Sequence, residues 1–97
     1  MNKEFIVSPD GTQGWYSGGV LHKKDGPAQI EKDGSHFYYF KGKLHRKDGP
    51  AVIRADGTKM WYKNGLLHRE SLPAVEYSDG DVEYWLNGEE VEVVEES

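Results

Sequence analysis

The chain lacks cysteine altogether, which excludes disulfide bonds, a thiolate nucleophile and a thiolate metal site. It lacks any long apolar run, so nothing in it resembles a signal peptide or a membrane span, and we expect a soluble, cytoplasmic protein. It also lacks helical periodicity, and its 12 glycines recur too often for helices. These absences leave a short, glycine-rich chain whose order must come from strands and turns.

What the chain does have is a pattern that recurs every 23 residues. In the third copy the pattern consists of a tight-turn dipeptide, an aromatic pair, a second turn, a Leu-His pair and a Pro-Ala pair: Asp56-Gly57, Trp61-Tyr62, Asn64-Gly65, Leu67-His68 and Pro73-Ala74. A fixed period this short predicts one small structural unit that stacks on copies of itself.

The residue types predict what this unit is. Residues 58–63 are rich in strand formers, Asn64-Gly65 is the strongest short hairpin signal, and residues 66–69 return as a short strand. A proline-containing link then leads to a further strand over residues 74–77. We therefore predict an all-β fold, an antiparallel β-hairpin repeat array that forms a long, twisted meander of about four units.

All 97 residues are expected to form a single domain. The chain divides into a starting strand, three regular copies and a degenerate copy with an acidic cap: residues 1–9, 10–32, 33–55, 56–78 and 79–97, respectively. In the cap Val91, Glu92 and Val93 alternate as in a last strand with one wet face. The carboxylates of this strand would discourage edge-to-edge aggregation.

The aromatic pairs are expected to form two columns, because successive side chains of a strand point to opposite faces. The first members line one face and the second members line the other: Trp15, Tyr38, Trp61 and Tyr84, against Tyr16, Tyr39, Tyr62 and Trp85. The sequence leaves open which column is the core and which is open to a partner.

The motif Asn64-Gly65-Leu66-Leu67-His68, together with Asp56-Gly57, resembles the MORN-repeat family, whose units also have a 23-residue period. The resemblance covers residues 10–88 and departs from the family where residues 47–51 replace the glycines that follow the histidine. It looks like the variant seen in bacterial and phage proteins, including antitoxin-like ones. The resemblance implies a β-hairpin array used for binding or scaffolding, and it does not imply an enzyme.

The histidines of the three Leu-His pairs invite a metal hypothesis that their spacing does not support. Equivalent positions in successive two-strand units lie about 10 Å apart, whereas the ligands of one zinc ion must each lie about 2 Å from it. We expect no metal site. Instead, each histidine is expected to bond to its own Asp-Gly-Pro link, as His22 can with Asp25 and His45 with Asp48. The third copy lacks that option, because Ser71 replaces the aspartate.

The sequence contains no catalytic motif. It has no nucleophile elbow, no phosphate loop, and no set of histidine, carboxylate and serine outside the repeated pattern. Residues that repeat in register are better explained by folding than by catalysis. We therefore expect a protein that is not an enzyme and that needs no cofactor.

The charge is distributed unevenly along the chain. Residues 1–69 hold all twelve basic residues and seven acidic ones, a net charge of +5, whereas residues 70–97 hold ten acidic residues and no basic one, a net charge of −10. Apolar and aromatic residues are interleaved with these carboxylates, which indicates an ordered acidic surface. The predicted partner-binding residues lie there: Glu76, Asp79, Asp81, Glu83, Tyr84, Trp85, Glu89, Glu90 and Glu92.

The sequence thus predicts a non-enzymatic protein-binding module. An ordered acidic strand surface can compete for a site that normally holds phosphates. The favoured interpretation is a small phage-type inhibitor of a basic, nucleic-acid-handling host defence protein, of anti-CRISPR type.

One alternative is a MORN-like scaffold or antitoxin-like protein that binds one cognate partner through its aromatic face. Another is a nucleic-acid binder that uses the Lys and Arg face, which the interleaved aspartates disfavour. The open strand edge at residues 5–7 would allow a homodimer.

Overall fold

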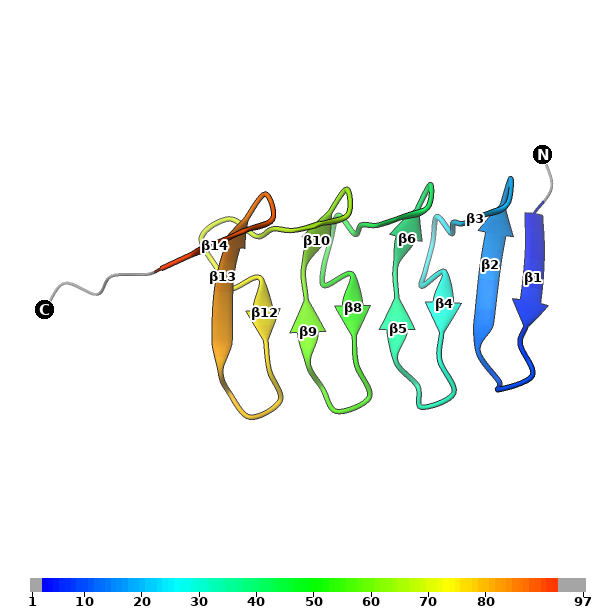
Figure 1. Ribbon diagram of the computed structural model, residues 1–97, viewed down its shortest axis with the longest axis horizontal. Coiled ribbons are helices and arrows are strands. Elements are labelled where there is room, and N and C mark those ends of the chain that lie inside the picture. Colours follow the sequence, from blue (N-terminus) through cyan, green and yellow to red (C-terminus); the bar gives the residue numbers. More distant parts are fainter. Residues whose placement is uncertain (1–2, 93–97) are drawn as a thin grey trace, which may run out of the picture.

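The computed structural model describes residues 3–92, and all regular structure in that range is β (Figure 1). The strands are β1 (Lys3–Val7), β2 (Gln13–Ser17), β3 (Val20–Leu21), β4 (Gln29–Ile30), β5 (His36–Phe37), β6 (Tyr39–Phe40), β7 (Lys43–Leu44), β8 (Val52–Ile53), β9 (Lys59–Met60), β10 (Tyr62–Lys63), β11 (Leu66–Leu67), β12 (Val75–Glu76), β13 (Val82–Leu86) and β14 (Glu89–Val91). Each described strand pairs antiparallel with its neighbours. The all-β antiparallel prediction is confirmed.

The strands build one long sheet with small hairpins along one margin. The sheet runs β1-β2-β4-β5-β8-β9-β12-β13-β14, with β3 paired to β2, while β6-β7 and β10-β11 form separate two-stranded hairpins. The molecule is elongated, with extents of 55 × 26 × 18 Å. In Figure 1 the Asp-Gly turns follow the lower margin and the glycine hairpin turns follow the upper one. Equivalent strands β2, β5, β9 and β13 are two strands apart along the sheet.

The predicted hairpin turn at Asn64-Gly65 is present. The φ angles are 51° at Asn64 and 86° at Gly65, and both must be positive in a type I′ turn. Asn87 and Gly88 repeat this geometry with 50° and 83°. These primed turns match the twist of the strands that they join, which is why each hairpin can be closed by only two residues.

The predicted strand over residues 58–63 is divided by Trp61 into β9 and β10. The Trp61 N–H donates to the carbonyl oxygen of Ala74 at 2.8 Å, and the Trp61 carbonyl accepts from the N–H of His68 at 3.0 Å. Trp61 therefore bonds to residues that flank two different strands, His68 after β11 and Ala74 before β12. The chain leaves the long sheet at that point to enter the hairpin. The return strands are also shorter than predicted, with β11 at residues 66–67 and β12 at residues 75–76.

Each Asp-Gly turn is closed by the aspartate side chain. Oδ1 of Asp33 accepts a hydrogen bond from the N–H of Ser35 at 2.9 Å, and Oδ1 of Asp56 accepts one from the N–H of Thr58 at 2.9 Å. The backbone bond lowers the pKa of Asp33, because it favours the charged carboxylate, and the Ser35 hydroxyl acts in the same direction. Asp56 has its pKa lowered by the corresponding groups of Thr58.

The fully buried core is thin and consists of small and branched side chains rather than rings. Its members are Ala28, Ala51, Val52, Ala74 and Val75, with the polar Ser35 and Thr58. All eight residues of the two aromatic columns are half-buried, so neither column alone is the core. The predicted last strand is β14, which ends at Val91, and Val93 lies outside the described residues.

The third link differs from the first two in its backbone. Ser71, which stands where the earlier links have Asp25 and Asp48, has a φ of 67°. A serine in this left-handed region is strained, because its Cβ approaches the backbone. The neighbouring Leu72 is half exposed. The third link, with serine in place of aspartate, therefore differs from the first two by backbone strain at Ser71.

Candidate binding surfaces

The histidine of each Leu-His pair accepts a hydrogen bond from the next hairpin turn. Nδ1 of His22 accepts a hydrogen bond from the N–H of Lys41 at 2.8 Å, and Nδ1 of His68 accepts one from the N–H of Asn87 at 2.9 Å. The expected bond to the histidine's own Asp-Gly-Pro link is therefore not the bond that the structure describes. The physical reason is stacking, which places a backbone N–H of the next turn within hydrogen-bond distance of Nδ1.

A row of cations lies over the first aromatic column. Nζ of Lys23 is 3.9 Å from the ring centroid of Trp15, Cζ of Arg46 is 3.9 Å from that of Tyr38, and Cζ of Arg69 is 3.8 Å from that of Trp61. These distances fall well inside the range of cation–π attraction. Each cation directly follows the histidine of its Leu-His pair in the sequence.

The two arginines also fix the links. Nη1 of Arg46 donates to the carbonyl oxygen of Pro50 at 3.1 Å, and Nη1 of Arg69 donates to that of Pro73 at 3.2 Å. Nη1 of Arg69 lies 3.3 Å from Oε2 of Glu76, which makes an ion pair. Each guanidinium therefore holds a link in place while it covers an aromatic ring.

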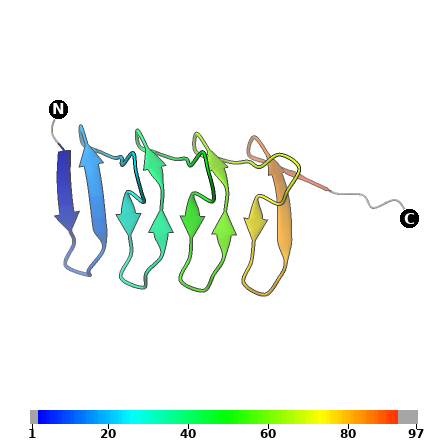
Figure 2. The same ribbon diagram turned by 180° about the vertical axis from the view of Figure 1, so that it is seen from behind.

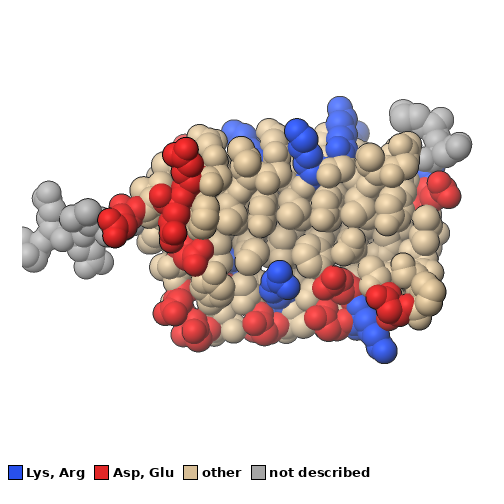
Figure 3. All heavy atoms as spheres, viewed as in Figure 1, with Lys and Arg blue, Asp and Glu red and all other residues tan. Residues whose placement is uncertain are grey.

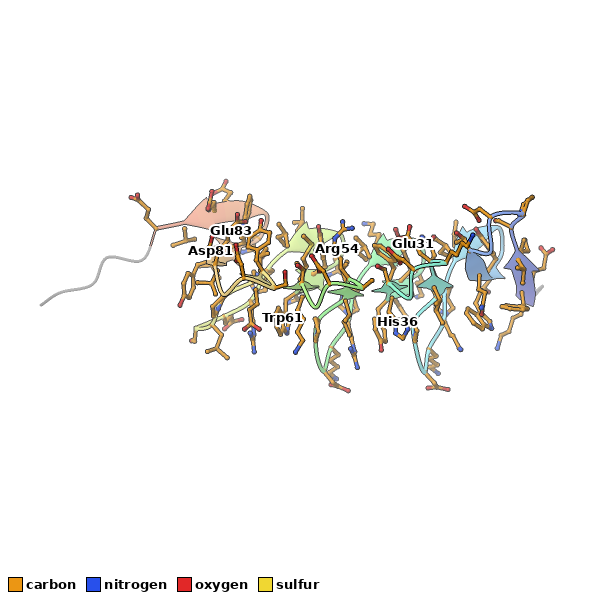
Figure 4. All side chains as sticks on the ribbon, turned by 90° about the horizontal axis from the view of Figure 1, so that it is seen from below. Glu31, His36, Arg54, Trp61, Asp81 and Glu83 are labelled. Carbon is orange, nitrogen blue, oxygen red and sulfur yellow. The ribbon has the colours of Figure 1, made fainter. Side chains whose placement is uncertain are left out.

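The links and the cations enclose three grooves in succession on one face of the sheet. The grooves have volumes of about 360, 770 and 440 Å³ from the N-terminal to the C-terminal side. The links lie toward the viewer in Figure 2, and Figure 4 shows Trp61 and His36 on the side from which they project. Glu31, Arg54 and Glu83 lie toward the opposite face in Figure 4.

The grooves carry a net positive charge. Seven basic and four acidic side chains line them: Lys3, Lys23, Lys24, Arg46, Lys47, Lys63 and Arg69, against Glu4, Asp25, Asp48 and Glu70. The histidines and the rings of the first aromatic column also line the grooves. The Lys and Arg face that the sequence suggests comprises Lys41, Lys43, Arg46, Lys47, Arg54, Lys59 and Lys63. Of these, Arg46, Lys47 and Lys63 line the grooves, but the cation–ring pairs are not predicted from the sequence. The signal was available in the fixed position of a basic residue after each Leu-His pair.

The predicted acidic site is distributed over the C-terminal end of the sheet. Figure 3 shows acidic side chains gathered over the end formed by β13 and β14. Five of the nine predicted residues are exposed carboxylates: Asp79, Asp81, Glu89, Glu90 and Glu92. Tyr84 and Trp85 are half-buried on β13.

Two of the predicted carboxylates are engaged inside the molecule. Glu83 accepts hydrogen bonds from the Tyr77 hydroxyl and from Nε1 of Trp85, each at 2.9 Å. The bond to Glu83 is the main cause that raises the pKa of Tyr77. Glu76 pairs with Arg69. The acidic surface that a partner could reach is therefore carried mainly by the turn at Asp79 and by β14.

Within residues 3–92 no three His, Asp or Glu side chains are grouped as a metal site, and no helix is long and apolar enough to cross a membrane. No protein-family model, curated protein or solved structure matches the chain. Function is therefore inferred from the two surfaces, the grooved face and the acidic end.

Proposed function

We propose that the protein is a non-enzymatic protein-binding module of MORN-like architecture, which holds one cognate partner along its grooved face. The observation that carries this proposal is the succession of three grooves, each lined by a half-buried aromatic ring under a cation. Aromatic and arginine side chains are the groups that most often dominate the affinity of protein interfaces. The rings and guanidinium groups are already ordered by the links, which lowers the entropy cost of binding.

A second candidate function belongs to the acidic end. The exposed carboxylates near β13 and β14 support an inhibitor of a basic, nucleic-acid-handling host defence protein, of phage anti-CRISPR type, that acts in the host cytoplasm. Such a surface would steer association electrostatically, and Trp85 would contribute to retention. In this case nucleic acid and the protein would compete for the partner, and removing carboxylates would slow association.

The experiment that separates these functions is affinity capture from host lysate with two charge variants. The double variant Lys24→Gln/Lys47→Gln alters the grooves, and Glu89→Gln/Glu90→Gln alters the acidic end by the same number of charges. If the grooved face binds the partner, a protein captured by the wild type is lost with the first variant and retained with the second. The reverse pattern supports the inhibitor and contradicts the grooved face.

Quantitative binding of the captured partner completes this test. For the grooved-face function, Lys24→Gln/Lys47→Gln should weaken affinity by about tenfold, because interface charges that pair with a partner contribute roughly 1 kcal/mol or more in total. Equal affinity of both variants and the wild type for the partner would contradict both functions. Tight binding of single-stranded nucleic acid that depends on Lys24 and Lys47 would instead identify a nucleic-acid binder.

A further inference from the structure

We infer that the grooved face recognises an extended acidic peptide that presents a carboxylate at every third residue. This inference rests on the proposed protein-binding function and specifies the chemistry of the partner segment.

The spacing of the cations matches three residues of an extended peptide. Lys23, Arg46 and Arg69 belong to units whose equivalent strands are two positions apart in the sheet. At about 4.8 Å per strand, successive cations are about 9.6 Å apart. Three residues of polyproline II span about 9.3 Å, and its repeat of three residues per turn brings side chains three positions apart to the same side. A carboxylate at every third position of such a peptide therefore meets one cation per unit.

The groups that line the central groove favour carboxylates. Arg46 uses an Nη1 donor for the carbonyl of Pro50 and lies over Tyr38, so its guanidinium is held in one orientation. A guanidinium has five donors, and a planar fork held in this way suits bidentate binding of a carboxylate. A neutral imidazole whose Nδ1 accepts a bond, as that of His45 does, carries its proton on Nε2 and offers a further donor.

A single-stranded nucleic acid fits these grooves less well. Non-specific binding of single strands depends on bases that stack on open aromatic faces, but a cation already covers a face of Trp15, Tyr38 and Trp61. Asp25 and Asp48 also line the central groove and would repel a continuous chain of phosphates. A peptide with two neutral residues between carboxylates can pass these aspartates without that repulsion.

The ends of the row limit the length of the bound segment. In the third unit, Arg69 is already paired with Glu76, and Glu70 takes the place that Lys24 and Lys47 have in the first two units. In the fourth unit, Glu92 stands where a further cation would be. The strongest attraction is therefore centred on the first two units, and a seven-residue peptide with three carboxylates covers the span from Lys23 to Arg69.

The test uses dye-labelled peptides with three glutamates and constant charge, measured by fluorescence anisotropy at low salt. The first probe separates the glutamates by two prolines, the second by one proline and the third by three prolines. The probe with two prolines should bind at least about fivefold more tightly than the others, because only its carboxylates meet successive cations. Arg46→Gln should weaken this binding by about tenfold, which corresponds to one charge-assisted hydrogen bond.

Two further variants keep the test independent of folding. Lys47→Gln removes an exposed groove charge and should also weaken binding, whereas Arg54→Gln removes a charge from the opposite face and should leave it unchanged. Equal affinity for all three spacings would overturn the inference, as would equal effects of Arg46→Gln and Arg54→Gln. A thymidine tetranucleotide that binds more tightly than the matched peptide would overturn it in favour of nucleic acid. If none of the peptides binds while binding of the captured partner is still lost in Lys24→Gln/Lys47→Gln, only the acidic-peptide inference is wrong and the proposed function stands.

Discussion

Nδ1 of His45 accepts a hydrogen bond from the backbone N–H of Asn64 at 3.0 Å, across 19 residues of sequence. The bond joins a Leu-His pair to the next hairpin turn, and the N–H of Gly65 adds a bond of 2.8 Å to the carbonyl oxygen of Leu44. We predict that His45→Phe lowers the free energy of unfolding by about 1 kcal/mol, the net value of one hydrogen bond. Urea unfolding measures this loss. His36→Phe is the control, since His36 lies outside these Leu-His pairs, and an equal loss there would contradict the prediction.

The second prediction concerns the stability of the turn at Asn64-Gly65. A Cβ on Gly65 would approach Lys43 no closer than 3.8 Å, so space is available, but the φ of 86° strains any β-branched residue. Gly65→Val should therefore lower the free energy of unfolding by roughly 1–3 kcal/mol. Asn64→Gly, which keeps a residue suited to positive φ, should cost much less. Thermal unfolding distinguishes the two variants, and unchanged stability of Gly65→Val would rule out a strained turn.

The strain at Ser71 predicts a stabilising substitution. Glycine adopts a φ of 67° without the Cβ clash, although it loses more entropy on folding. We expect Ser71→Gly to raise the free energy of unfolding by up to about 1 kcal/mol. Gly49→Ser, in the second link, should destabilise for a different reason, because Gly49 has no positive φ and a Cβ there would lie 3.2 Å from the Arg46 guanidinium. A loss of stability in Ser71→Gly would show that entropy outweighs the strain.

The Asp-Gly turns predict acid sensitivity. The pKa values of Asp10, Asp33 and Asp56 are lowered below 3.8 in the folded state, mainly by backbone N–H groups. The unfolded state therefore binds more protons as the pH falls through this range. The stabilisation is fully present above about pH 4 and is lost as the pH falls through the folded pKa values.

Asparagine tests this relationship, because its side-chain oxygen can still accept the turn bond but cannot be protonated in this range. In Asp33→Asn/Asp56→Asn the free energy of unfolding should depend less on pH between about 4 and 2 than in the wild type. Urea unfolding across this range gives the comparison. Identical slopes in the two proteins would show that these turns do not contribute to acid sensitivity.

The N-terminal edge predicts self-association. β1 is at the end of the sheet, and its side chains Phe5, Ile6 and Val7 are 53%, 44% and 57% exposed. We propose that two copies pair antiparallel along β1 in a C₂ dimer, which satisfies the free edge and covers these side chains. Light scattering at high protein concentration should give twice the chain mass, and Ile6→Lys should give the monomer. A monomer mass for the wild type would refute the dimer.

The local features of the fold could be predicted from the sequence, and the contacts between units could not. Asn64-Gly65 determines its turn through backbone preferences that act within two residues. The partner of His45 depends instead on how the second unit lies against the third, which no local preference contains. The alternation of side chains predicted two aromatic columns and favoured a thin core to which both contribute, and all eight rings are indeed half-buried. In the first column the links contribute to this burial, because they place Lys23, Arg46 and Arg69 over the rings.

The candidate site shows the same division. The exposed carboxylates at Glu89 and Glu90 could be recognised from charge alone, because no basic residue accompanies them in the sequence. The internal role of Glu83 could not, since it requires both Tyr77 and Trp85 to reach one carboxylate. The grooves could not be predicted from the sequence either, because they form only between links that lie side by side in the fold.

The bonds from each Leu-His pair to the following turn have a consequence for how such a chain can change its length. A duplication or deletion of one whole 23-residue block would return every histidine to a turn N–H and would alter the length by about 9.6 Å. A block of any other size would leave a histidine Nδ1 and a turn N–H without each other as hydrogen-bond partners. Size variation in descendants of this gene should therefore occur in steps of 23 residues.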